Sequence, residues 1–205
     1  MTAVRLPSAE ILLRSPISPS PELVREVEAL GPVSYLVASN WFHHLFVGEW
    51  LRVCPDARVY VAPGLDEKLA DLKIEGVLTD ASELGWAGTL DQVLANGCPL
   101  ANEVVFSHRP SKTLVATDLA FNLGPGSPPL TRLAFRLNRT YGRLAPTFLK
   151  RLLVHGRPAF RRSLLRILEW PFKRIVVAHG QFVESGGREK LERGYGWLLG
   201  GERAT

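Results

Sequence analysis

The sequence predicts an α/β sandwich with mixed sheets, and three observations carry this prediction. Short β-branched runs such as 33–39 and 58–62 alternate with amphipathic segments, which is the β-α-β order of a layered α/β fold. In the middle of the chain, 103–108 and 112–117 flank an Arg-Pro-Ser turn and read as a β-hairpin, so the sheets are not wholly parallel. No G-x-G-x-x-G phrase follows the first strand, so a Rossmann-type nucleotide fold lacks support.

The first half of the chain is predicted to alternate strands and helices. Ser20-Pro21-Glu22 after an initial strand has the form of an N-cap with proline at the first helical position. Gly31-Pro32 is a stop signal for that helix. The further elements expected in this half are strand 33–39, a helix from about Phe42 to Cys54, strand 58–62, a short helix at 68–72 and a short strand at 76–80.

The second half is predicted to contain the hairpin, a helical section and one more strand. We expect 81–101 to be irregular. Apolar side chains at helical spacing over 130–168, interrupted near two prolines, indicate two or three helices. A strand at 174–178 and a last amphipathic helix over about 188–199 complete the prediction of one domain, 1–205, in which 128–168 is a helical insertion.

Composition places the chain among ordinary globular proteins. Apolar residues make up 46% and charged residues 22%, and no run approaches the roughly 18–20 apolar residues that span a bilayer. The first residues lack the pattern of a secretory signal. Cys54 and Cys98 have no metal-type spacing, and we interpret both as buried thiols in a reducing compartment. A cytoplasmic location is therefore expected.

Positive charge is concentrated in one section of the chain. Residues 128–174 contain twelve Lys or Arg and a single acid, whereas the remainder carries 13 bases and 19 acids. This asymmetry predicts an anionic surface, ligand or partner for the basic helices. A solvated helix face that happens to be basic is an equally good interpretation.

Three predicted strands end in side chains that can bind a metal or move a proton. Strand 33–39 runs into Asn40-Trp41-Phe42-His43-His44, the hairpin ends at Asp118, and strand 174–178 ends in His179-Gly180. We expect these ends to meet in one site.

Each of these residues also has a structural interpretation. Adjacent residues at a helix start diverge by about 100°, so only one histidine is expected to face the cleft, and we favour His44 over His43. Asn40 either contacts a ligand or caps the next helix, with capping favoured, and Trp41 is a cleft wall or core residue. Asp118 can be a turn cap. The glycine after His179 can simply permit a tight turn.

Several short motifs of the sequence, taken together, resemble those of a known family. The run from Phe42 to Trp50, FHHLFVGEW, with Pro63-Gly64-Leu65 and Thr117–Phe121, is similar to the DUF4336 group of the metallo-β-lactamase-like superfamily. The resemblance extends from about Ile11 to Val183. It implies the αββα sandwich of that superfamily, with the basic helices as an insertion.

The resemblance also implies a reduced metal site. Ordinary members carry H-x-H-x-D-H at the first strand end and bind two zinc ions there, but the matching segment of this chain breaks the motif in either register. Asp118 matches the bridging aspartate and His179 the final histidine. With His44 or His43 they form a three-ligand set, suited to one divalent ion (zinc, iron or manganese). The alternative is that no metal is bound.

Three functions follow from this prediction. The first is a hydrolase that uses a metal-activated water on a small-molecule substrate. The second is a catalytically inactive relic of the fold that holds a small ligand. The third is a binding module whose basic helices contact nucleic acid or an anionic membrane surface. The helices at 128–168 are open to two roles, a lid over the cleft or the contact of a homodimer.

Overall fold

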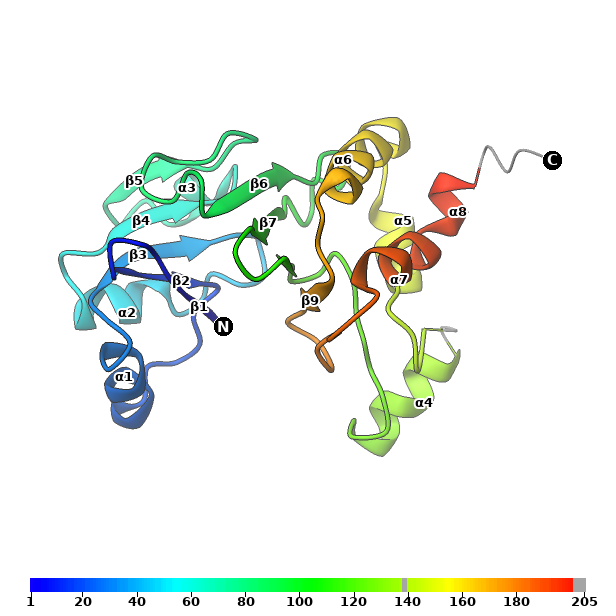
Figure 1. The fold of residues 1–205 in the computed structure, drawn as a ribbon, viewed down its shortest axis with the longest axis horizontal. Coiled ribbons are helices and arrows are strands. Elements are labelled where there is room, and N and C mark those ends of the chain that lie inside the picture. Colours follow the sequence, from blue (N-terminus) through cyan, green and yellow to red (C-terminus); the bar gives the residue numbers. More distant parts are fainter. Residues whose placement is uncertain (138–139, 201–205) are drawn as a thin grey trace.

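Two mixed β-sheets form the centre of the molecule, which was obtained as a computed structural model and is described for residues 1–137 and 140–200 (Figure 1). The first sheet has the order β1-β2-β3-β4-β5. Its first pair is antiparallel and the remaining pairs are parallel. The strands are β1 Thr2–Arg5, β2 Ile11–Arg14, β3 Val33–Ala38, β4 Arg58–Val61 and β5 Ile74–Val77.

The second sheet has the order β6-β7-β8-β9. Two antiparallel pairs are followed by the parallel pair β8–β9, so the predicted mixed character and the predicted hairpin are both confirmed. The strands are β6 Leu90–Leu94, β7 Val104–His108, β8 Thr113–Val115 and β9 Arg174–Val176.

The helices lie outside the two sheets, which face each other. One buried cluster joins side chains of the first sheet, such as Leu36, to those of the second, such as Phe106. Alternate residues of β7 point the other way, so Val105 packs in a second cluster with Phe160 and Ile167 of α6. The layers are therefore those of an αββα sandwich. The helices are α1 Pro21–Glu28, α2 Val47–Val53, α3 Leu65–Lys68, α4 Pro129–Leu137, α5 Phe148–Leu153, α6 Arg157–Glu169, α7 Gly187–Gly194 and α8 Gly196–Leu199.

Helices of two kinds occupy the predicted basic insertion. The long α6 buries one side against the second sheet. In contrast, α4 has no buried residue and projects at the lower right of Figure 1. One of the twelve cations in 128–174, Arg139, lies outside the described residues. The last five residues of the predicted domain, 201–205, lie outside them as well. No helix within the described part of the chain is long and apolar enough to cross a bilayer.

Several elements differ from the prediction. Strands β1 and β6 are not predicted by the sequence pattern, and both exist through antiparallel pairing with a neighbour. The predicted helix at 188–199 is interrupted at Tyr195, whose ring is buried and whose hydroxyl donates to the carbonyl of Leu119. The helix expected from Phe42 begins only at Val47. Cys98 is buried as predicted, whereas Cys54 is half-buried, and both are free thiols.

Candidate metal centre

The ends of β3, β8 and β9 meet, and three side chains of metal-ligand type converge there. His43 Nε2 lies 3.3 Å from Asp118 Oδ2, and His179 Nε2 lies 3.1 Å from Asp118 Oδ1. One potential ligand atom from each residue lies within 4.8 Å of the other two. Within residues 1–137 and 140–200, this is the single group of three such side chains.

Asn40 determines how the chain leaves β3 and where His43 points. The Oδ1 atom of Asn40 accepts hydrogen bonds from the backbone N–H groups of Phe42 (3.1 Å) and His43 (2.8 Å). This side-chain-to-backbone turn stabilises a non-helical segment. The Nδ2 atom donates to Asp118 Oδ2 at 2.6 Å and to Thr117 Oγ1 at 2.8 Å. Asn40 therefore shapes the loop and also holds the central carboxylate.

The preference for His44 over His43 does not agree with this geometry. It assumes that the histidines begin a helix, but they lie in the loop before α2. His43 lies against Asp118. His44 is only 5% exposed and is not a member of the group. Burial lowers the pKa of the His44 imidazole, and the positive charge of Lys68 adds to this effect.

His179 is held by the turn that follows β9. Gly180 has a φ of +111°, and a Cβ atom there would lie 2.1 Å from the carbonyl oxygen of Asn122. The chain can pass Asn122 this closely only because the residue is glycine. The backbone N–H of Asn122 donates to the carbonyl of His179 at 3.0 Å. The Phe121 ring stacks on the imidazole with an interplanar angle of 7° and a centroid distance of 5.0 Å.

A series of buried polar contacts holds Thr117, the residue before Asp118. Glu103 is 0% exposed, and its Oε1 atom accepts from the backbone N–H (2.6 Å) and the hydroxyl (2.8 Å) of Thr117. Arg14, 3% exposed, places Nη2 3.7 Å from the same oxygen and donates to the carbonyl of Val104. Sequence reasoning missed Glu103 and Arg14. The available signal was a charged residue beside each of two apolar strand runs.

The electrostatics of the group centre on Asp118, whose side chain is 13% exposed. Burial by itself would raise the pKa of this carboxyl group. Hydrogen bonds from His179 and His43 outweigh burial and hold the pKa well below its usual range. Asp118 is therefore an ionised acceptor between two imidazoles.

The donor set fits a divalent metal. Each histidine faces a different oxygen of Asp118, at 3.3 and 3.1 Å, and one potential ligand atom from each of the three residues lies within 4.8 Å of the other two. Two imidazole nitrogens with one carboxylate suit zinc, and also iron or manganese. His43, Asp118 and His179 could hold such an ion and leave a position open.

Trp41 belongs to the same loop as His43, between β3 and α2, but its ring contacts the segment before α3. Its indole N–H donates to the carbonyl of Pro63 at 2.9 Å. The ring packs so closely on Gly64 that a Cβ atom there would lie 2.9 Å from it. These contacts give Trp41 a packing role between β3 and α3, and its role as a cleft wall stays a prediction.

Comparison with known proteins identifies the family and the fold. A family model described as a domain of unknown function, DUF4336, matches residues 1–141. No curated protein matches the sequence.

Solved structures resemble the whole sandwich. The Flv1 flavodiiron core from Synechocystis sp. PCC6803 has a TM-score of 0.64 at 13% identity, covering 98% of this chain and 52% of that one, so this chain spans about half of its length. The DIM-1 metallo-β-lactamase has a TM-score of 0.61 at 12% identity, covering 98% and 86%. The mono-zinc form of the metallo-β-lactamase FIM-1 from Pseudomonas aeruginosa has a TM-score of 0.60 at 15% identity, covering 97% and 82%.

At identities of 12–15%, these likenesses concern the fold alone. The family model covers 141 of the 205 residues. The chain therefore belongs to the DUF4336 family and has the metallo-β-lactamase fold.

Proposed function

We propose that this protein binds one divalent metal ion through His43, Asp118 and His179 and acts as a metal-dependent hydrolase on a small molecule. The observation that carries the proposal is the convergence of three ligand-type side chains from three separate strand ends, within 4.8 Å. The carboxylate of Asp118 lies between two imidazoles, beyond the strand ends of both sheets, and this arrangement favours a coordination role.

The chain's own residues would hold and orient the ligands. Asn40 donates to Asp118 Oδ2 and so fixes the plane of the carboxylate. Phe121 restricts the rotation of the His179 ring by stacking on it. A bound divalent ion would supply Lewis-acid activation of water.

One ion rather than two is favoured by the residues around the group. The loop positions beside His43 carry Trp41, which is hydrogen-bonded to Pro63, and Phe42, which is mostly exposed. Neither side chain can ligate a metal. FIM-1, which shares the fold, has been seen in a mono-zinc form. The competing function is a relic of the fold, in which Asp118 is merely hydrogen-bonded to the two histidines.

Metal analysis of the purified full-length protein tests the proposal directly. After expression with added zinc, iron or manganese, we expect about one equivalent of one of these metals per chain. His179→Ala and His43→Ala should each remove most of it, because three ligands are the minimum for a stable site of this kind. His44→Gln and the exposed His155→Ala serve as matched controls and should keep the metal. Less than about a tenth of an equivalent in the wild-type protein would contradict metal binding and favour the relic.

Hydrolysis is tested separately on the metal-loaded protein. We expect the wild-type protein to cleave at least one of four kinds of probe: an ester, a thioester, a lactam or a phosphodiester. The rate of that cleavage should fall by about 100-fold or more in His179→Ala. Restoring the metal to chelated wild-type protein should restore the rate. A protein that holds one equivalent but cleaves none of these bonds would contradict the hydrolase assignment and leave the metal site standing.

A further inference from the structure

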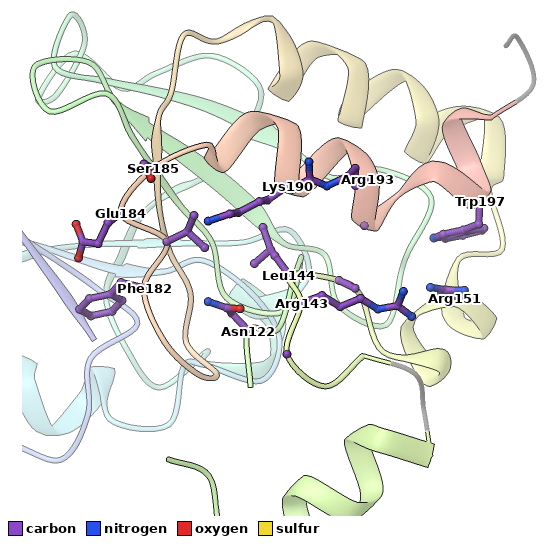
Figure 2. Close-up of a pocket in the computed structure, with 14 residues that line it drawn as sticks. Asn122, Arg143, Leu144, Arg151, Phe182, Glu184, Ser185, Lys190, Arg193 and Trp197 are labelled. Carbon is purple, nitrogen blue, oxygen red and sulfur yellow. The ribbon is translucent and has the colours of Figure 1, made fainter. Parts of the chain in front are cut away.

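A second site-like feature lies apart from the metal centre. A pocket of about 480 Å³ opens between α7, the loop after β9, the segment around Arg143 and the α5 helix (Figure 2). None of the three candidate metal ligands lines it. Its wall carries four cations, from Arg143, Arg151, Lys190 and Arg193, against one carboxylate, from Glu184, which gives a net charge of +3.

Within residues 1–137 and 140–200, these cations have no carboxylate partner. Across the described residues, no ion pair involves any of the four. Four cations around one pocket repel one another, and an anion bound there would relieve this repulsion.

One cation of the pocket, Arg151, is also positioned by an aromatic ring, and within the described residues two donor groups of this pair lack acceptors. The Nε–H of Arg151 and the indole N–H of Trp197 are shielded from solvent and have no hydrogen-bond partner. The Arg151 guanidinium stacks 5.6 Å from the centroid of the Trp197 ring. This cation–π contact holds the guanidinium in place before any ligand arrives.

The shape of the pocket suits a small molecule with an anionic end. Figure 2 shows the Arg143 side chain extending toward Arg151 and Trp197, whereas Lys190 extends the other way, toward the side of Glu184 and Phe182. Leu144 and Val183 add apolar wall between these ends. A volume of about 480 Å³ falls in the range of small-molecule sites.

We propose that this pocket binds a phosphorylated small molecule. A phosphate monoester carries a charge of about −1.5 to −2 and three acceptor oxygens, which matches a pocket with a net charge of +3 better than the single charge and two oxygens of a carboxylate. One guanidinium group can donate two parallel hydrogen bonds to two phosphate oxygens. The basic section of the sequence supplies Arg143 and Arg151, and α7 supplies Lys190 and Arg193.

Calorimetric titration of the full-length protein with inorganic pyrophosphate tests the proposal. We expect saturable binding at one site. Arg143→Gln and Lys190→Gln should each weaken it by about tenfold or more, the effect of losing one charge-assisted hydrogen bond. Arg143 is exposed and Lys190 is half-buried at the pocket wall, so both variants should fold, and thermal melts check this. Arg188→Gln, on the same helix as Lys190 but outside the pocket, is the matched control and should change the affinity less than about twofold.

The outcomes separate this site from the metal centre and from other anions. His179→Ala, which lacks the proposed metal, should bind pyrophosphate as the wild type does. Loss of binding in this variant would mean that pyrophosphate had bound at the metal centre, and would overturn the assignment. Equal affinity for succinate would refute the preference for phosphate. A single-stranded oligonucleotide that binds more tightly than pyrophosphate and competes with it would replace the small molecule by nucleic acid.

Discussion

Replacing Glu103 by glutamine is expected to lower the free energy of unfolding by about 3 kcal/mol. The substitution keeps an acceptor oxygen for the two hydrogen bonds from Thr117, but it removes the negative charge that faces Arg14 at 3.7 Å. Breaking a buried ion pair by removing one partner costs about 3–5 kcal/mol. The lower end applies because the Arg14 guanidinium keeps its hydrogen bond to the carbonyl of Val104.

Urea unfolding at neutral pH measures this loss, and a thermal melt should shift by about 6–12 °C for a chain of this size. Asp91→Asn is the matched control, because the Asp91–Arg109 pair is more exposed although its atoms lie as close as 2.5 Å. It should cost about 1 kcal/mol or less. If Glu103→Gln cost no more than the control, burial would not be what makes the Arg14–Glu103 pair important. The reasoning about the buried polar contacts that hold Thr117 would then be refuted.

Two further predictions concern the loops of the candidate metal centre. Gly180→Ala should destabilise the protein by more than about 1 kcal/mol, since the new Cβ atom would meet the carbonyl of Asn122. The midpoint of urea unfolding measures this loss. The control is Gly196→Ala, where nothing lies within 4 Å of the added Cβ atom, and its midpoint should change little. For His44, burial and Lys68 lower the pKa in the folded state, so the unfolded state binds the proton more readily and the free energy of unfolding should fall as the pH drops below about 6.5. His44→Gln should flatten this dependence in urea titrations across that range, and an unchanged slope would argue against a buried neutral imidazole.

The hairpin and the strand ends could be predicted because their signals are local. Alternating β-branched runs and the residues that stop them are visible within windows of about five to eight residues. This is why the sequence pattern alone places Asp118 and His179 after strands, although β8 and β9 end earlier than predicted and each residue lies three positions beyond its strand. β6 escaped prediction because Asp91 and Gln92 interrupt its apolar pattern. Its strand conformation comes from pairing with β7, and buried Gln92 is satisfied by Trp86 and two backbone carbonyls.

The sequence by itself determined which chemical groups stand where three strands stop, because a strand and its terminating residue are encoded by neighbours in the chain. Only the tertiary structure decided that His43 rather than His44 joins Asp118. The carboxamide of Asn40, held by that distant carboxylate, turns the loop away from a helix. The basic pocket has the same origin, since Arg143 and Lys190 come from separate segments of the chain and meet only in the fold. Convergence of this kind depends on how sheets and helices pack, and no local window of the sequence contains it.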